Sequence, residues 1–152
     1  MDHPLLFQKA IKLLAARDHS VEELRGKLHK YEQDEGVVEA VIGRCLEMKY
    51  LDDVRFARLF SESLERKGKG PRFIAIELTK RGVEDGIISQ VINTEDGNED
   101  LRATEAALKK LKSFTKDVPR VRREKIIRFL QGRGFSSDTC YRVAQSVTKD
   151  SH

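Results

Sequence analysis

The stretch that decides the fold reads LRGKLHKYEQDEGVVEAVI at residues 24–42 and returns as IAIELTKRGVEDGIISQVI at residues 74–92. The two copies share apolar positions fifty residues apart with no gap: Leu24 and Ile74, Leu28 and Leu78, Val37 and Ile87, Val38 and Ile88, Val41 and Val91, and Ile42 and Ile92. A third copy follows after two extra residues, with Ile126, Leu130 and Val143 at the positions of Ile74, Leu78 and Val91. A fixed period in this range is typical of tandem units that bury their apolar faces against one another. The sequence therefore predicts repeats that work through an extended surface.

Within each copy the apolar residues recur at helical spacing, and no alternating β-branched run bounded by hairpin turns is found. We expect nine helices in three groups of three. Several local signals place their ends: a capping box of Ser20 and Glu23, an aspartate before Val54, Pro71 as a first helical residue, Gly82 and Gly134 as helix stops, and Ser136 or Ser137 as a cap for the ninth helix. The predicted fold is all-α, with three-helix repeats at residues 1–53, 54–98 and 99–152.

Charge drifts along the 152 residues of the chain. Residues 1–53 carry 8 basic and 11 acidic side chains, residues 54–93 carry 8 and 5, and residues 94–152 carry 13 and 9. Within the last segment, residues 109–133 hold ten basic side chains against only Asp117 and Glu124, a local net charge of +8. Such a surface attracts an anionic partner over distances near the Debye length.

The remaining composition points to a protein without a metal or a membrane segment. Cys45 and Cys140 fall on apolar helical stripes, so both are expected to be buried and reduced. The four histidines have no metal-ligand spacing and are expected to face solvent: His3, His19, His29 and His152. No apolar run approaches the roughly twenty residues of a membrane span, and the start of the chain is unlike a secretory signal. We expect a cytoplasmic protein with no cofactor.

The central motifs resemble those of a known family. They read YLDDVRFA at residues 50–57, RKGKGPR at residues 66–72, IEL at residues 76–78 and KRGV at residues 80–83. These strings are similar to the signature of the RecX family of bacterial recombination regulators, and the threefold repeat extends the resemblance over almost the whole chain. The third unit matches more loosely, through Arg133, Gly134 and Phe135.

The resemblance implies a cytoplasmic, non-enzymatic protein that binds the RecA recombinase filament on single-stranded DNA. Members of the family lower ATP hydrolysis, strand exchange and filament growth, and their repeats form an elongated, curved array. The implied partners of this chain are the RecA filament and, through weak and salt-dependent contacts, single-stranded DNA. We expect a monomer. Whether such a protein caps filament ends or inserts along the groove stays open.

Two groups of basic residues are the candidate binding sites. The group assigned to the protein partner lies at the turn between the fourth and fifth helices and at the end of the fifth, and contact with DNA in the filament groove is the alternative for it. It consists of Arg66, Lys67, Lys69, Arg72, Lys80 and Arg81. The group assigned to nucleic acid consists of Lys109, Lys110, Lys112, Lys116, Arg120, Arg122, Arg123, Lys125 and Arg128. Phe114 and Phe129 are interpreted as core positions rather than stacking platforms, so we expect contacts to phosphates and no reading of bases.

Catalytic interpretations are weaker. Asp52 and Asp53 could hold a divalent ion, but a helix cap accounts for the pair and no other acidic cluster joins it. Residues 68–70 have two glycines and a lysine but lack the spacing of a phosphate-binding loop, and Ser136 and Ser137 lack a glycine elbow. Two alternatives to the filament regulator remain: a sequence-neutral DNA-binding protein that acts without RecA, and a helical scaffold between other proteins.

Overall fold

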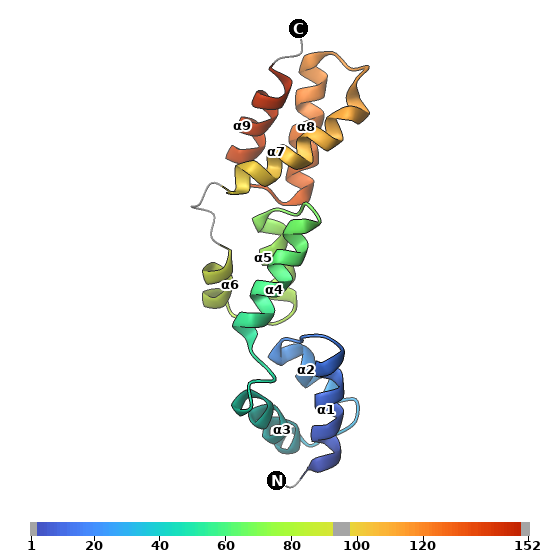
Figure 1. Cartoon of the computed structure of the whole chain (residues 1–152), viewed down its shortest axis with the longest axis vertical. Helices are drawn as coiled ribbons and strands as arrows, with labels where there is room; N and C mark the ends of the chain where they lie inside the picture. The colour runs from blue at the N-terminus through green and yellow to red at the C-terminus, as the bar shows by residue number, and fades with distance from the viewer. Residues whose placement is uncertain (1–2, 93–97, 150–152) are drawn as a thin grey trace. The chain divides into compact units, whose positions relative to one another are not determined.

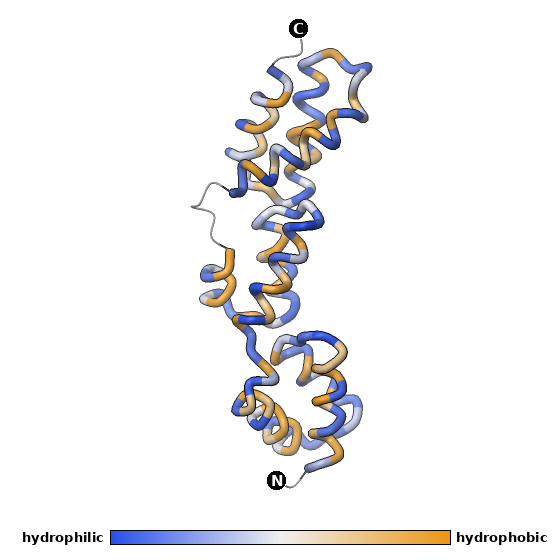
Figure 2. The backbone as a smooth tube through the Cα atoms, in the orientation of Figure 1, coloured by the Kyte–Doolittle hydropathy of each residue, from blue (hydrophilic) through white to orange (hydrophobic). Residues whose placement is uncertain are grey.

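The computed structural model describes residues 3–92 and 98–149 (Figure 1). Its helices are α1 (Pro4–Ala16), α2 (Val21–Leu28), α3 (Glu35–Glu47), α4 (Asp53–Arg66), α5 (Pro71–Lys80), α6 (Asp85–Val91), α7 (Asn98–Leu111), α8 (Pro119–Arg133) and α9 (Ser137–Thr148), with a 3₁₀ turn at Lys112–Phe114. No strand occurs in these two ranges. The all-α prediction with three successive groups of three helices is confirmed. Apolar and polar stretches alternate along the helices, as expected when each buries one side (Figure 2).

The chain forms two compact units. The first comprises the described residues up to Phe60 together with Leu78–Val91, and the second comprises Ser61–Glu77 together with the described residues from Ile92 onward. The division passes through α4 and α5, so the compact units are not the predicted repeats. The repeat boundaries follow the equivalence of sequence positions and stay a prediction.

The core of the first unit is built from the repeated apolar positions. Leu24 and Leu28 of α2 pack with Val38, Val41 and Ile42 of α3, and all five side chains are buried. Burying one such side chain stabilises the fold by roughly 1.5–3 kcal/mol. The residues that define the fifty-residue period therefore hold the first three helices together.

The third copy does the same in the second unit. Ile126 and Leu130 of α8 are fully buried, and they pack with Val143 of α9 and with Ala103 and Ala107 of α7. The two alanines leave room for the larger side chains that face them. Because these residues bury one side of α7 and α8, the other side of the two helices is left to line the candidate site.

Most of the expected helix ends are confirmed. Ser20 and Glu23 form a full capping box, and Asp52 accepts hydrogen bonds from the backbone of Val54 and Arg55. Gly82 and Gly134 adopt left-handed φ values of 79° and 94°.

The predicted serine cap of α9 is confirmed in position but not in its hydrogen bond. Ser136 occupies the N-cap position, but its hydroxyl lies 3.1 Å from the Thr139 hydroxyl and makes no cap bond. Its own N–H donates to the Glu99 carboxylate at 2.8 Å. A carboxylate of α7 therefore accepts a backbone N–H at the start of α9.

Both cysteines are buried free thiols, as expected. Burial raises the pKa of Cys45, and it raises the pKa of Cys140 to about 11. The expectation for the histidines is wrong at His19, which is only 2% exposed. His3 and His29 are half-buried, and His152 lies outside the described residues. Among the described helices, none is long and apolar enough to cross a membrane.

Candidate functional site

A cleft of about 350 Å³ lies in the second unit, lined by the end of α4, the turn after it, α7 and α8. Six of its lining side chains are basic and two are acidic. The basic ones are Arg66, Lys67, Arg102, Lys109, Lys110 and Arg133, and the acidic ones are Glu65 and Glu105. We call this site the basic cleft. Its excess of cations favours an anionic ligand.

Main-chain hydrogen bonds bring the α4–α5 turn to the end of α8. The N–H of Gly70 donates to the carbonyl of Arg133 at 2.7 Å, and the N–H of Arg72 donates to the carbonyl of Gly134 at 2.9 Å. A Cβ atom at position 70 would lie 2.6 Å from the carbonyl group of Gly134, so only glycine allows this approach. We call this contact the main-chain junction. It places Arg66 and Lys67 beside α7.

Arg133 connects this junction to the cleft. Its Nη1 donates to the carbonyl of Lys67 at 3.0 Å, and its guanidinium lies 5.1 Å from the ring centre of Phe129. The Lys110 ammonium lies 5.4 Å from the same ring centre. Phe129 is half-buried against the core of the second unit and also lines the cleft. The cleft thus contains an aromatic ring with two cationic side chains close to it.

One of the two acidic side chains is already paired. Arg102 Nη1 lies 3.1 Å from a carboxylate oxygen of Glu65, with the two side chains 24% and 34% exposed. By contrast, Arg66, Lys67 and Lys109 are exposed, and none forms an ion pair with another described residue. These three cations remain available for a ligand.

The structure divides the group that the sequence assigned to the protein partner. Arg66 and Lys67 line the basic cleft. Lys69 lies over the ring of Phe73, 4.4 Å from its centre, and Arg72 is exposed next to the main-chain junction. Lys80 and Arg81 belong to the other compact unit, so the six residues are not one surface of either unit.

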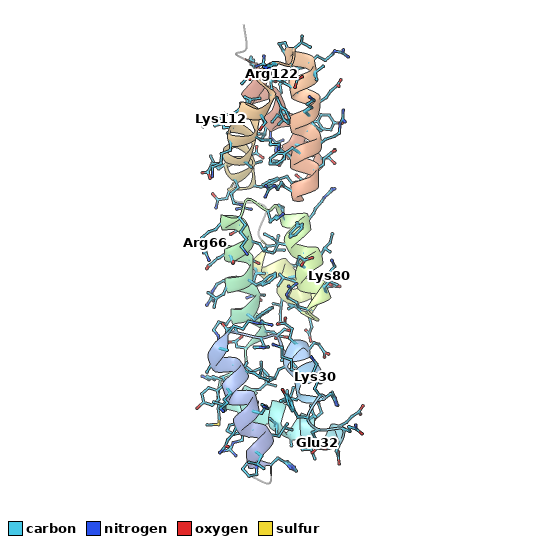
Figure 3. The ribbon with its side chains drawn as sticks, turned by 90° about the vertical axis from the view of Figure 1, so that its right-hand side faces the viewer. Lys30, Glu32, Arg66, Lys80, Lys112 and Arg122 are labelled. Atoms are coloured by element: carbon cyan, nitrogen blue, oxygen red, sulfur yellow. The ribbon has the colours of Figure 1, made fainter. Side chains whose placement is uncertain are left out.

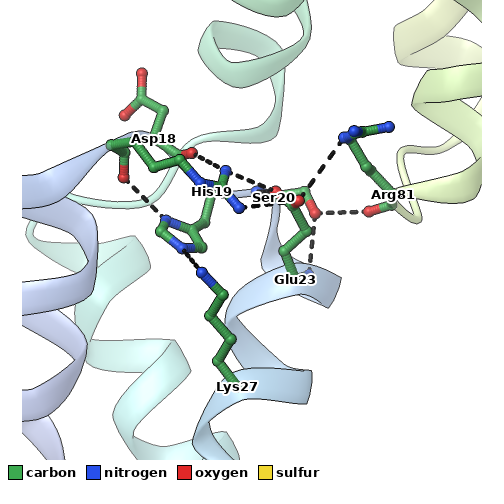
Figure 4. A network of polar contacts seen from close by, with 7 residues as sticks. Asp18, His19, Ser20, Glu23, Lys27 and Arg81 are labelled. Carbon is green, nitrogen blue, oxygen red and sulfur yellow. Dashed lines mark hydrogen bonds and ion pairs between the residues drawn. The ribbon is translucent and has the colours of Figure 1, made fainter.

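Arg81 takes part in a polar network at the start of α2 (Figure 4). Ser20 donates its hydroxyl hydrogen to the Arg81 carbonyl at 2.6 Å. The Arg81 Nε lies 3.8 Å from Glu23, and the guanidinium lies 4.3 Å from the ring centre of Phe60. The Glu23 carboxylate also accepts a hydrogen bond from the Ser20 N–H. Arg81 is therefore engaged in packing the first unit.

The group assigned to nucleic acid is likewise spread out. Lys109 and Lys110 line the basic cleft, whereas Lys112 and Arg122 lie toward the opposite end of α7 and α8 from Arg66 (Figure 3). Several of the others have partners. Lys125 pairs with Asp117 at 2.8 Å, Arg120 lies 3.9 Å from Glu124, and Arg123 Nε lies 3.4 Å from the Thr148 hydroxyl. Lys116 and Arg128 are exposed.

Two basic residues of the cleft, Arg102 and Arg133, were absent from both predicted groups. Arg102 sits on α7 among acidic neighbours, and no local pattern marks it. Arg133 precedes Gly134 and Phe135 in the family-like motif of the third unit, and that position is the signal that could have identified it. The interpretation of Phe114 and Phe129 as core residues holds only in part, because both rings are partly buried and both also lie near lysines.

The adjacent aspartates have structural roles. Asp52 caps α4, and an Asp53 carboxylate oxygen accepts the N–H of Val21 at 2.8 Å. Burial raises the pKa of Asp53, while the hydrogen bond from Val21 opposes that rise. Over residues 3–92 and 98–149, no group of three or more histidine, cysteine or acidic side chains is arranged to hold a metal ion.

Comparison with known proteins covers each repeat. Residues 7–45 match the first three-helix domain of RecX, residues 52–92 the second, and residues 99–144 the third. A crystal structure of RecX from Lactobacillus salivarius has a TM-score of 0.85 at 22% identity, covering 93% of this chain and 94% of that one, and it has the same fold.

Sequence relatives give closer matches. The regulatory protein RecX of Halorhodospira halophila is 39% identical over 143 residues, which cover 93% of this chain and 87% of that protein. That of Vibrio parahaemolyticus is 39% identical over 132 residues, covering 86% and 84%. That of Listeria welshimeri is 33% identical over 144 residues, but these are only 54% of its length. With all three of its repeats matched, the chain belongs to the RecX family of regulatory proteins.

Proposed function

We propose that this chain binds the RecA filament assembled on single-stranded DNA and lowers its ATP hydrolysis, strand exchange and growth. Membership of the RecX family supports this proposal, because the resemblance implies RecA as the partner. The protein would act in the cytoplasm without catalysing a reaction. Binding to the filament would depend on complementary charge and shape. A surface with several unpaired cations provides the charge.

The observation that carries the proposal is the basic cleft. It gathers cations from the second and third repeats, and three exposed ones, Arg66, Lys67 and Lys109, have no acidic partner among the described residues. A filament on DNA offers both phosphates and acidic protein surface at a regular spacing. Several weak contacts to such a periodic partner give a strong total interaction.

The test is the rate of RecA ATP hydrolysis on single-stranded DNA, measured with increasing amounts of the full chain. The wild type should inhibit at amounts below those of RecA. A variant carrying Arg66→Gln, Lys67→Gln and Lys109→Gln should need at least about ten times more protein for half inhibition, which corresponds to a loss of about 1.4 kcal/mol.

A matched control removes three positive charges elsewhere. Lys12, Lys30 and Lys49 are exposed lysines of the first unit and lie outside the basic cleft. Replacing all three by glutamine should leave the inhibition curve unchanged. No inhibition by the wild type at any concentration would overturn the proposed function. Equal weakening by the two triple variants would overturn the role of the cleft.

The second candidate is a DNA-binding protein that acts without RecA, and the net positive charge of the basic cleft favours it. It predicts tight binding to bare DNA, with a logarithmic salt dependence of about −0.7 per phosphate contacted on a single strand. Binding that is weak on bare DNA and strong only on the RecA filament would exclude this candidate.

A further inference from the structure

The basic cleft contains an apolar surface that phosphate binding does not need. Phe129 lines the cleft with its exposed part, while the rest of the side chain packs against the core of the second unit. The ring is thus held in place by α8 and by the core behind it. Phosphate is bound by hydrogen-bond donors and cations, and an aromatic ring supplies neither. An aromatic ring among cations instead suits a ligand that combines a flat ring with negative charge.

The cations beside the ring are also arranged for such a ligand. Arg133 is fixed by its hydrogen bond to the Lys67 carbonyl, so its planar guanidinium is held near Phe129 before any ligand arrives. Guanidinium groups stack on flat rings and attract phosphate. Lys110, which approaches Phe129 at 5.4 Å, has a flexible side chain that can turn toward a phosphate.

Size and charge limit what fits. The cleft of about 350 Å³ lies at the small end of ligand pockets, which span roughly 300–1,000 Å³, so it suits one nucleotide rather than a stack of bases. Around its rim, the exposed Arg66, Lys67 and Lys109 can contact the phosphates on either side of that nucleotide. In a duplex the bases are paired and stacked, and a base reaches a protein ring only after it leaves the stack.

We infer that the basic cleft holds one unstacked nucleotide of a single strand, with its base against Phe129 and Arg133 and its phosphates on the rim cations. This inference rests on the proposed function, to which it adds the form of nucleic acid that the site selects. It departs from the expectation from the sequence that only phosphates are contacted, because it adds a contact to a base. A free nucleoside triphosphate has the same chemistry, and the experiment separates the two sources.

The experiment measures binding of the full chain, without RecA, to fluorescein-labelled strands by anisotropy. The probes are a thymidine 20-mer, a strand of equal length with abasic sites throughout, and a duplex. The wild type should bind the thymidine strand most tightly, because base–aromatic stacking contributes roughly 1–3 kcal/mol per base. Phe129→Leu should weaken binding of the thymidine strand about tenfold and leave binding of the abasic strand unchanged.

Two further variants make the result specific. Phe129→Tyr retains the ring and should bind all three probes as the wild type does. Phe114→Leu removes a ring that packs against the same core and lies near Lys110 but does not line the cleft, so it should change nothing. Far-ultraviolet circular dichroism checks that each variant keeps its helices. If Phe129→Leu does not fold, the difference in affinity of the wild type for the thymidine and abasic strands still tests whether a base is bound.

Equal affinity of the wild type for the thymidine and abasic strands would overturn the inference. So would equal weakening of both strands by Phe129→Leu. Displacement of the labelled strand by thymidine triphosphate at equal phosphate concentration would assign the cleft to a free nucleotide and overturn the assignment to a strand. None of these results bears on inhibition of RecA, which is measured separately, so the proposed function stands or falls independently.

Discussion

Two contacts between segments that are distant in the sequence, one in each compact unit, are built differently: side chains take part in the first, and the second is made by main-chain atoms on both sides. In the first unit the start of α2 meets the α5–α6 turn through side chains, with Ser20 bound to the Arg81 carbonyl and Glu23 close to the Arg81 guanidinium. We call this contact the side-chain junction. In the second unit the main-chain junction joins Gly70 and Arg72 to the carbonyls of Arg133 and Gly134.

The difference predicts different sensitivities. Carboxylates, guanidiniums and a buried histidine surround the side-chain junction, so its stability depends on protonation. The main-chain junction has no titratable atom in its two hydrogen bonds and depends instead on the close approach of two backbones. Since the main-chain junction also positions the rim of the basic cleft, the geometry of that site should be insensitive to pH and sensitive to small changes of shape.

The largest effect is expected at Gly70. In Gly70→Ala the new Cβ would lie 2.6 Å from the backbone of Gly134 and Phe135, which no flexible side chain can relieve. Overpacking of this kind lowers the free energy of unfolding by about 1–3 kcal/mol, and we expect the upper end of that range because the backbone must move. Urea denaturation followed by circular dichroism measures the loss, and binding of the thymidine strand should weaken in parallel.

The control for Gly70→Ala lies in the same unit. Gly132 is exposed in the last turn of α8, and a Cβ there meets nothing within 4 Å. Gly132→Ala should therefore stabilise the protein by about 0.5–1 kcal/mol through helix propensity. A loss of similar size in both variants would show that the close approach at the main-chain junction is not what makes Gly70 necessary.

A smaller effect is expected at Ser20. Its hydroxyl accepts the Glu23 N–H at 3.0 Å and donates to the Arg81 carbonyl at 2.6 Å, and the residue is fully buried. Ser20→Ala removes both bonds and should cost about 1–2 kcal/mol in the free energy of unfolding. Ser136→Ala is the matched variant, because Ser136 is an N-cap residue without a cap bond. Its cost should be about 0.5 kcal/mol, and equal costs would contradict the special role of Ser20.

The architecture could be predicted because it depends on short-range patterns. Apolar spacing within about twenty residues defined the helices and their buried sides, and the period then identified the equivalent positions. Caps such as Ser20 and Asp52 involve neighbours only three residues away. Each of these features can be recognised from the order of residues along the chain, so no tertiary contact had to be known in advance.

The candidate site could not be predicted in the same way. The basic cleft needs residues 65–68 beside residues 102–133, and no local signal encodes that approach. Closeness in the sequence was also a poor guide to a shared surface. Arg72 and Lys80 were predicted to belong to one group, although about 12 Å of helix α5 separates them at 1.5 Å per residue. His19 was predicted to face solvent, but it is only 2% exposed, and its ring contacts the Arg17 carbonyl and the Lys27 ammonium.

The smallest and most specific prediction concerns pH and His19. The His19 Nδ1 lies 2.9 Å from the carbonyl of Arg17 and must donate to it, while the ammonium of Lys27 donates to Nε2 at 2.8 Å (Figure 4). This arrangement requires a neutral imidazole. Burial lowers the pKa of His19, and the charges of Arg17 and Lys27 lower it further, against the opposing effects of the Arg17 carbonyl and Glu23.

The sign of the effect follows from this lowered pKa. An unfolded histidine binds its proton near pH 6.5, whereas the folded one does so only at lower pH. The stabilising contribution of His19 is therefore complete above about pH 6.5 and is lost as the pH falls toward the folded pKa. Glu23 acts at lower pH, because its pKa is lowered from an already acidic value by hydrogen bonds from Arg17 and Ser20 that outweigh the effect of burial.

The measurement compares the urea midpoint of the wild type with that of His19→Gln between pH 5 and pH 7.5. The glutamine side chain of this variant has an amide oxygen that can accept from Lys27 but no proton to gain, so the wild type should lose more stability than the variant as the pH falls. The cost of Gly70→Ala, by contrast, should be the same at both ends of the range. Parallel pH profiles for the wild type and His19→Gln would show that the side-chain junction is as indifferent to protonation as the main-chain junction, and the distinction between them would then rest on shape alone.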